Sequence, residues 1–199
     1  MFVVFEGLDK SGKSTLSRSV HTKLNKMNVS AKEIHFPDRS SVIGDILDKY
    51  LTGKMNIDPE STHLLFTADR YNKKKYIEET SKDNVLLCDR YSWSGIACSS
   101  AKGLDMAWCI DTERLLPQPD LTILLVADID ITMKRSNWGD EVLETRDFQM
   151  KMAEGYSHMH EFVDNVVKLD ATKSVEELTD LVLEEIEKFF RGRCVQIQN

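Results

Sequence analysis

The sequence predicts a three-layer α/β fold in which a five-stranded parallel sheet carries helices on both faces. Two observations favour this fold class. Short apolar runs alternate along the chain with segments of helical periodicity, which is typical of a parallel sheet covered on both sides. A glycine-rich phosphate-binding motif also lies directly after the first of these runs. The 199 residues, 41% of them hydrophobic, suffice for a substantial core, and we expect residues 1–199 to form a single domain.

Five runs fit the strands of such a sheet, at residues 2–6, 31–35, 85–88, 121–126 and 165–169. The segments between them are mostly helical in their spacing. Two apolar stripes in the C-terminal part of the chain indicate helix faces that pack on the core. The first is formed by Phe148, Met152, Met159 and Val163, and the second by Leu178, Leu181, Val182, Ile186 and Phe189.

The segment from Gly7 to Ser14 matches the complete phosphate-binding pattern G-x-x-x-x-G-K-[ST]. Its context fits as well, because an apolar run precedes it and apolar residues at helical spacing follow it. Gly7 and Gly12 let the backbone turn so that its N–H groups converge on phosphate oxygens at the start of a helix. Lys13 would reach the β- and γ-phosphates, and the Ser14 hydroxyl would bind Mg²⁺. The sequence therefore predicts a P-loop NTPase fold that uses a nucleoside triphosphate.

Composition limits the partners that we expect. A formal net charge of −7 argues against a broad surface for DNA or RNA. No apolar run approaches the roughly 18 residues that span a bilayer, and the first strand begins at residue 2 without room for a leader. We therefore expect a cytoplasmic protein, small enough for nuclear entry. The cysteines form no C-x-x-C pair and are expected to be reduced thiols: Cys88, Cys98, Cys109 and Cys194.

Polar residues that follow the predicted strands are candidates for chemistry, because ligands bind at the carboxyl ends of parallel strands. Arg39 follows the second strand, and Asp89 and Arg90 end the third. Phe66 and Arg70 are four residues apart, on one face of a predicted helix. The aromatic ring could stack on a base while the arginines bind its edge and a second phosphate group. Taken alone, Phe66 could instead be core and Arg70 could pair with a surface acid, but the clusters together favour a nucleotide site.

In order and spacing, these motifs resemble those of the thymidylate kinase family over nearly the whole chain, and more closely its eukaryotic and poxviral branch than the common bacterial one. The resemblance is carried by Phe5-Glu6 with the phosphate loop, Phe36-Pro37-Asp38-Arg39-Ser40, Leu64-Leu65-Phe66 with Arg70, Asp89-Arg90-Tyr91, Ser94-Gly95, Leu116-Pro117-Gln118-Pro119-Asp120-Leu121 and Phe148-Gln149. It implies transfer of the ATP γ-phosphoryl group to dTMP, giving dTDP and ADP for dTTP synthesis, with Mg²⁺ as cofactor. It also implies a homodimer.

The resemblance further implies roles for individual residues. The catalytic residues would be Asp9, Lys10, Lys13 and Arg90. ATP would be bound by Gly7, Ser11, Gly12, Lys13, Ser14, Thr15, Arg135 and Lys173. The substrate would be bound by Asp9, Phe36, Arg39, Phe66, Arg70, Arg90, Ser94, Gly95, Cys98, Glu144 and Gln149. Ser14 and Asp89 would hold the metal, and residues 134–149 would form a short lid.

Three positions depart from the usual pattern of this branch. Lys10 stands in the phosphate loop where most members have Arg, so it keeps the positive charge without the planar fork of a guanidinium. Cys98 stands where Tyr or Phe usually crowds the sugar, and Leu143 stands in the lid where Tyr is common. The smaller Cys98 predicts weaker discrimination against ribose or tolerance of bulkier analogues.

The expected mechanism is direct in-line transfer without a covalent enzyme intermediate, in which positioning and charge stabilisation do most of the catalysis. Two alternatives remain open on the sequence. A kinase for another nucleotide or a nucleoside would share the phosphate loop. A GTPase-type switch would need an N-K-x-D motif, and the nearest match, Asn25-Lys26-Met27-Asn28, lacks the final Asp.

Overall fold

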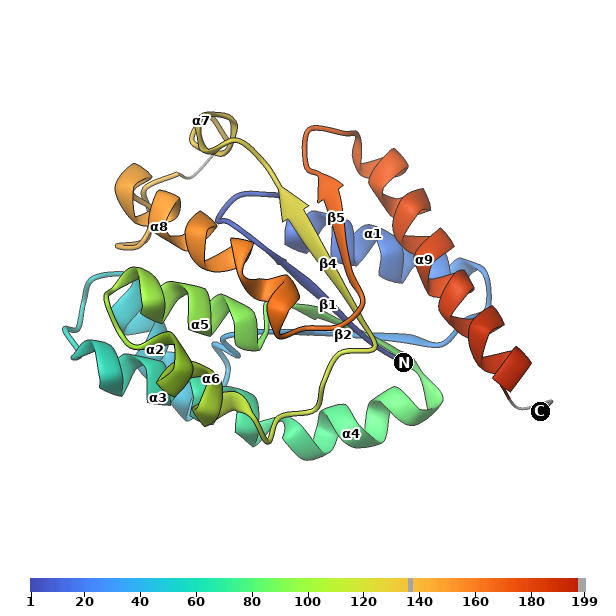
Figure 1. Ribbon diagram of the computed structural model, residues 1–199, viewed down its shortest axis with the longest axis horizontal. Coiled ribbons are helices and arrows are strands. Elements are labelled where there is room, and N and C mark those ends of the chain that lie inside the picture. Colours follow the sequence, from blue (N-terminus) through green and yellow to red (C-terminus); the bar gives the residue numbers. More distant parts are fainter. Residues whose placement is uncertain (136–137, 197–199) are drawn as a thin grey trace.

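A computed structural model describes residues 1–135 and 138–196 (Figure 1). Its five-stranded sheet is parallel throughout, with the strand order β2-β3-β1-β4-β5. The strands are β1 (Phe2–Gly7), β2 (Ala31–His35), β3 (Val85–Asp89), β4 (Leu121–Val126) and β5 (Val166–Asp170). Each bound lies within one residue of the range expected from the sequence, and the α/β fold class is confirmed.

Helices cover both faces of this sheet. Helices α1 and α9 lie together on one face, whereas α4, α5 and α8 cover the other, with α2, α3 and α6 beside them (Figure 1). The helices are α1 (Lys13–Lys26), α2 (Val42–Leu51), α3 (Pro59–Asn72), α4 (Lys74–Asp83), α5 (Ser92–Ala101), α6 (Met106–Glu113), α7 (Ile129–Thr132), α8 (Arg146–Ser157), the 3-10 turn η1 (Met159–Glu161) and α9 (Val175–Gln196).

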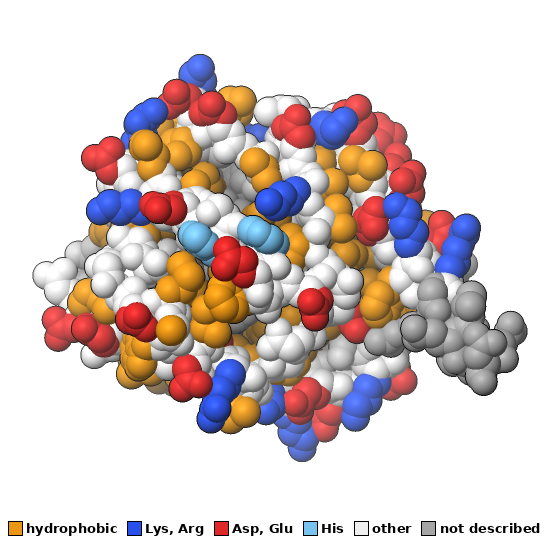
Figure 2. Space-filling model, viewed as in Figure 1, with side chains coloured by type: hydrophobic (Ala, Val, Ile, Leu, Met, Phe, Trp, Pro, Cys, Tyr) orange, Lys and Arg blue, Asp and Glu red, His pale blue; other side chains and the backbone are white. Residues whose placement is uncertain are grey.

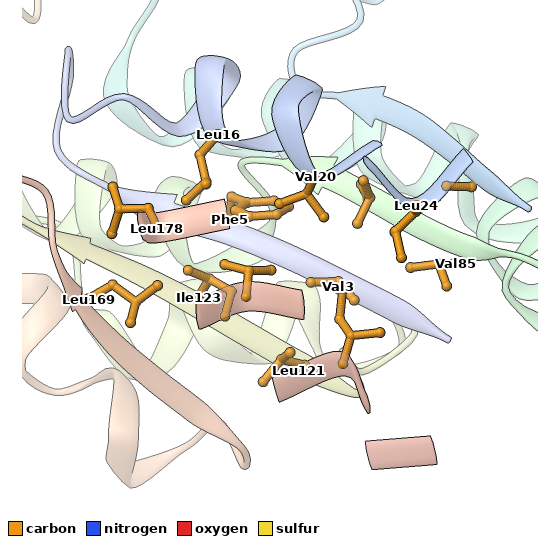
Figure 3. Packing of buried hydrophobic residues seen from close by; sticks show 14 of the residues in the cluster. Val3, Phe5, Leu16, Val20, Leu24, Val85, Leu121, Ile123, Leu169 and Leu178 are labelled. Atoms are coloured by element: carbon orange, nitrogen blue, oxygen red, sulfur yellow. The ribbon is translucent and has the colours of Figure 1, made fainter. Parts of the chain in front are cut away.

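The alternation of side chains along the strands divides the core between the two faces. Val3 and Phe5 of β1 point to the face covered by α1 and α9, where they are fully buried. Figure 3 shows this packing, in which side chains of α1 and α9 meet those of the central strands. The cluster includes Leu16, Val20, Leu24, Leu121, Ile123, Leu169 and Leu178. Burial of this apolar surface holds α1, and with it the phosphate-binding loop, in a fixed place on the sheet.

The opposite face has its own buried clusters. Phe2 and Val4 of β1 pack there with Ile77 of α4. Trp93 of α5 and Met152 of α8 form the core of a neighbouring cluster. These contacts fix α5 and α8 next to the carboxyl ends of β1 and β3, where the polar residues singled out in the sequence are found.

The C-terminal part differs from the expected helices in one respect. The apolar stripe from Phe148 to Val163 does not lie on one continuous helix, because α8 ends at Ser157 and Met159 lies in a 3-10 turn. The Ser157 hydroxyl donates to the Glu154 carbonyl at 2.6 Å, a local bond that competes with the continuing helix. All four residues of the stripe nevertheless pack in the same core cluster, as expected.

The segment expected to form a lid, residues 134–149, is called the lid below, and it ends in a helix. Its last residues form the first turn of α8, which begins at Arg146 after a Thr145 cap that accepts from Phe148. Ser136 and Asn137 lie outside the described residues, as does the side chain of Cys194. Cys88, Cys98 and Cys109 are buried free thiols.

Within the described residues, no helix has the length and apolar character needed to cross a bilayer. On the face shown in Figure 2, acidic and basic side chains are interspersed over the surface rather than gathered by sign.

Candidate active site

A cavity of about 730 Å³ lies at the carboxyl ends of β1 and β3. It is lined by the phosphate-binding loop, the segment after β2, and residues of α3, α5 and the lid. This is the edge at which ligands of an open parallel sheet are expected. The cavity brings together motifs that are more than one hundred residues apart in the sequence.

The phosphate-binding loop leads directly from β1 into α1. Gly7 has a φ of +140°, and a Cβ added there would lie 2.5 Å from the Leu125 carbonyl oxygen of β4. Gly12 has a φ of +104° and forms the N-terminal cap position of α1. Both positions therefore require glycine, and the resulting loop places free backbone N–H groups at the positive end of α1.

Lys13 is folded back over this loop. Its ammonium group donates to the Leu8 carbonyl at 2.6 Å and to the Gly7 carbonyl at 3.1 Å, and the side chain is buried. Burial, together with the positive charge of Arg90, lowers the pKa of Lys13 to about 8. An anion bound in the loop would oppose both effects, because its negative charge would favour the charged form of the buried ammonium group.

Ser14 and Asp89 lie side by side, one at the start of α1 and the other at the end of β3. The Ser14 hydroxyl donates to one carboxylate oxygen of Asp89. The other oxygen, Oδ1, is buried and has no hydrogen-bond partner among the described residues. A hydroxyl beside a buried, unpaired carboxylate oxygen fits Mg²⁺, which prefers oxygen ligands. The described residues contain no group of three or more His, Cys, Asp or Glu side chains suited to a metal, so phosphate and water would supply most ligands.

Asp9 and Arg90 form an ion pair between the loop and the end of β3. Burial tends to raise the pKa of Asp9, but Arg90, Lys13 and the Gln149 amide lower it below its usual value. For Arg90 the effects are reversed. Burial tends to lower its pKa, but Asp9 and other nearby acidic groups raise it well above the usual value. Both side chains are therefore charged near neutral pH.

Glu6 supports this region and was not predicted from the sequence. Its carboxylate is buried and accepts hydrogen bonds from the backbone N–H groups of Tyr91 and Ser94, at 3.0 and 3.1 Å. The hydroxyls of Ser94 and Tyr156 donate to it as well. These bonds fix the turn after β3, in which Arg90 has a φ of +66°. A charged residue inside an apolar strand was the available signal in the sequence.

Phe66 and Arg70 face the cavity from one side of α3, as their spacing predicted. Phe66 is half-buried, whereas the guanidinium of Arg70 is only 2% exposed. Its partner is Glu113 at the end of α6, which accepts from Nε at 2.9 Å and also from Nη2. The alternative of a surface partner for Arg70 is therefore wrong, because the acid that pairs with it is itself 3% exposed. Sequence reasoning missed Glu113, which belongs to none of the motifs.

Arg39 extends from the segment between β2 and α2 and lines the same cavity. It pairs with Asp48 of α2 and with Glu141 of the lid. Burial tends to lower the pKa of Arg39, but Glu141 and Asp48 raise it above the usual value. Glu141 and Asp48 were also missed. Glu141 lies about one hundred residues from Arg39 in the sequence, and Asp48, although only nine residues away, belongs to none of the motifs.

The lid contacts the phosphate-binding loop through two cations. Lys10 pairs with Glu144 at 3.0 Å, and Glu144 also accepts from the backbone N–H of Gly139 at 2.7 Å. Arg135 donates to the Lys10 carbonyl at 2.7 Å and to the Ala171 carbonyl at 2.9 Å. The lid, the phosphate-binding loop and the loop after β5 thus meet at one side of the cavity.

The sequence of this chain is similar to those of known proteins. It matches the family model described as thymidylate kinase over residues 5–182. This chain belongs to the thymidylate kinase family. It is 37% identical to a thymidylate kinase from Plasmodium falciparum over 190 residues, covering 94% of this chain and 90% of that protein. It is 35% identical to a thymidylate kinase from Dictyostelium discoideum, covering 100% of this chain and 88% of that protein.

The fold is shared with a thymidylate kinase of known structure. The structure of thymidylate kinase from Candida albicans superposes on this chain with a TM-score of 0.85 and is 32% identical to it. The match covers 94% of this chain and 91% of that one. Members of the thymidylate kinase family are phosphotransferases that phosphorylate dTMP, and this chain is an enzyme of that class.

The structure brings most residues that the thymidylate kinase resemblance singled out to one cavity. Those that line it are Asp9, Lys10, Gly12, Lys13, Ser14, Thr15, Phe36, Arg39, Phe66, Arg70, Asp89, Arg90, Ser94, Gly95, Cys98, Arg135 and Glu144. Gly7 and Ser11 are buried within the phosphate-binding loop. Gln149 is fully buried behind Asp9, where its side-chain oxygen accepts from the Asp9 N–H at 3.0 Å. Lys173 is exposed on the loop after β5, outside the cavity lining.

Proposed function

We propose that the cavity binds Mg·ATP and dTMP together and transfers the γ-phosphoryl group directly to the dTMP phosphate, giving dTDP and ADP. One observation carries this proposal. The phosphate-binding loop, the cations Arg39 and Arg90, and the Phe66/Arg70 pair all line a single cavity. The cavity therefore offers a triphosphate site, a monophosphate site and a base site at once.

ATP binds on the side of the phosphate-binding loop. Backbone N–H groups at the start of α1 and the Lys13 ammonium hold its phosphates. Arg135, which lies across the loop, and Lys173, on the neighbouring loop after β5, are assigned to the adenosine end. Ser14 and Asp89 hold Mg²⁺, which neutralises phosphate charge when bound.

The monophosphate of dTMP binds between the loop and the ends of β2 and β3. Arg39 and Arg90 are its cationic partners, and Asp9 takes the sugar hydroxyl. The thymine ring lies against Phe66, with its O4 edge towards Arg70. Phe36, Ser94, Gly95 and Cys98 complete the walls, and Glu144 and Gln149 hold the lid and Asp9 in place.

The chemistry requires positioning and charge rather than a strong base, because the attacking phosphate oxygen is already ionised near neutral pH. Lys13, Lys10 and Arg90 stabilise the charge that develops during in-line transfer. The lid excludes water and so limits wasteful hydrolysis of ATP.

Two further proposals concern the location of the protein and its assembly. A cytoplasmic location and a homodimer are proposed on the family resemblance. Exposed apolar side chains on or just after α3 and α6 are available for packing between subunits: Leu64, Trp108 and Leu115.

The test is ADP release from Mg·ATP and dTMP by the unmodified chain and by Lys13→Ala. Lys26→Ala is the matched control, because it removes an exposed lysine from the far end of the same helix. We expect turnover with dTMP to fall by a factor of about 10² or more in Lys13→Ala and to stay unchanged in Lys26→Ala. Chelation of the metal should also abolish turnover. Full activity of a folded Lys13→Ala protein would refute the assignment of the loop.

A further inference from the structure

Arg70 is held by a cluster of buried groups that the proposed roles of the site do not use. Glu113 accepts from Nε and Nη2 of Arg70, so its two carboxylate oxygens engage two nitrogens of the guanidinium. Thr67, one turn earlier on α3, donates to the same carboxylate at 2.7 Å. Glu113 and Thr67 are both buried. A bidentate pair of this kind fixes the plane of the guanidinium as well as its position.

Helix α5 supports the same arrangement from the other side. A Cβ added at Gly95 would lie 2.4 Å from Nη2 and 3.2 Å from Nη1 of Arg70. The guanidinium therefore lies against the bare backbone of Gly95, and side chains of any other residue would displace it. Three helices, α3, α5 and α6, thus determine where Arg70 points.

One nitrogen of Arg70 remains for a ligand. Nη1 makes no hydrogen bond with the described part of the chain, whereas Glu113 engages Nε and one of the two N–H groups of Nη2. Arg70 nevertheless lines the cavity, on the same helix face as Phe66. Nη1 is therefore the nitrogen of the guanidinium that keeps both of its N–H groups to meet a base.

We propose that Glu113 is a positioning residue that sets base specificity by aiming Nη1 of Arg70 at the substituent on position 4 of a pyrimidine. This inference rests on the proposed function, in which Arg70 meets the thymine edge. Thymine and uracil carry an oxygen at position 4, which accepts from Nη1. Cytosine carries an amino group there, so the N–H donors of the base would face the N–H donors of Nη1.

The arrangement cannot adapt to the second case, because a guanidinium has no acceptor. Burial tends to lower the pKa of Arg70, but Glu113 raises it above the usual value, so the group stays protonated. A rigid donor is a device that rejects the wrong base as well as binding the correct one.

The test compares kcat and KM for dTMP and dCMP in the unmodified chain and in Glu113→Gln, with KM for ATP measured alongside. The amide supplies one oxygen and one competing donor, so Arg70 loses its bidentate partner. We expect kcat/KM for dTMP relative to dCMP to fall at least about tenfold, mainly through KM for dTMP. KM for ATP should not change. A purely structural Glu113 would lower thermal stability without altering this ratio.

A second pair of variants keeps the test decisive if Glu113→Gln does not fold. Thr67→Val removes one hydrogen bond to Glu113 and leaves its charge intact. Thr62→Val is the matched control, because Thr62 is also buried on α3 and its hydroxyl donates to the backbone carbonyls of Ile57 and Asp58. We expect a smaller fall in the dTMP to dCMP ratio for Thr67→Val and none for Thr62→Val.

The outcomes separate this inference from the function on which it rests. Folded variants at Glu113 or Thr67 that keep the dTMP to dCMP ratio and KM for dTMP would overturn the role of Glu113 alone. An unmodified chain without activity on dTMP would overturn the proposed function and this inference together.

Discussion

At the scale of single residues, Cys98 is the position where this site departs most from the expected pattern. Its side chain lines the cavity from α5 and is 7% exposed. Burial raises the pKa of its thiol, so the group is a small neutral side chain near neutral pH. In the proposed binding mode, in which Cys98 lies beside the sugar, this side chain leaves more space than a Tyr or Phe would.

Replacing Cys98 with Tyr should strengthen the preference for deoxyribose. We expect the ratio of kcat/KM for dTMP to that for UMP to rise about tenfold, because a larger ring would crowd the 2′-hydroxyl. Cys98→Ser keeps the size of the side chain and should leave the ratio as it is. The account of this position fails if Cys98→Tyr folds and shows the same ratio as the unmodified chain.

Lys10 offers a second prediction at this scale. Its backbone has a φ of +56°, a conformation that few residues other than glycine adopt. Its side chain pairs with Glu144. Lys10→Ala should lower kcat by a factor of about 10² with little effect on thermal stability, because a cation near the transferred group is lost. Lys10→Arg should restore turnover. A Lys10→Ala protein with unchanged kcat would show that the charge is not used in catalysis.

At the scale of elements, the site is assembled by loops that rigid helices and strands hold in place. The lid is tied to the rest of the molecule by Glu144 on Lys10, by Glu141 on Arg39, and by the Val142 N–H, which donates to the Leu51 carbonyl at 2.9 Å. Carboxylates of the lid therefore pair with Lys10 and Arg39, two cations that the proposed function assigns to phosphate groups. Substrate must replace at least the contact between Glu141 and Arg39.

Glu141→Gln should therefore lower KM for dTMP. The pair is partly exposed, so we expect a change of about fivefold or less, and a smaller change at high salt. Asp140→Asn is the matched control, since it alters an exposed neighbouring carboxylate. The measurement is KM for dTMP at saturating ATP. A higher KM for dTMP in Glu141→Gln than in the unmodified chain would contradict the idea that substrate displaces this contact.

The segment between β2 and α2 is held by Asp38, which pairs with Lys73 at 2.8 Å. The bonds from Lys73 and Ser40 lower the pKa of Asp38 from 3.8 to about 2. This contribution to stability is complete above pH 3.8 and is lost as the pH falls towards 2. Lys73→Met should cost less than about 1 kcal/mol near neutral pH, because both side chains are partly exposed.

The difference in unfolding free energy between the unmodified chain and Lys73→Met should shrink as the pH falls from 3.8 to 2. Denaturant unfolding at several pH values measures it. Lys75→Met, at a far more exposed lysine, should show no such trend. A difference that stays constant with pH would rule out the Asp38 pair as its cause.

At the scale of the whole molecule, the sheet and the outline of the site could be predicted because they depend on local patterns. The five strands and their parallel arrangement follow from alternating apolar and helical segments, and Lys13 and Arg90 are placed by contiguous motifs. The roles of Glu113 and Glu6 were not predicted, although the charge of Glu6 inside an apolar strand was a signal that could have found it. Their roles depend on contacts with Arg70 and Ser94, which only tertiary packing creates.

We propose that this one cavity transfers a phosphoryl group from ATP to dTMP. The most direct measurement is ADP release from Mg·ATP with dTMP, dUMP, UMP, dCMP, dGMP or AMP as acceptor, at equal concentrations. We expect the highest kcat/KM for dTMP and measurable activity on UMP, because Cys98 leaves space. Among the pyrimidine nucleotides, dCMP should have the lowest kcat/KM. A higher kcat/KM for another acceptor, or no acceptor-dependent release of ADP, would contradict this proposal.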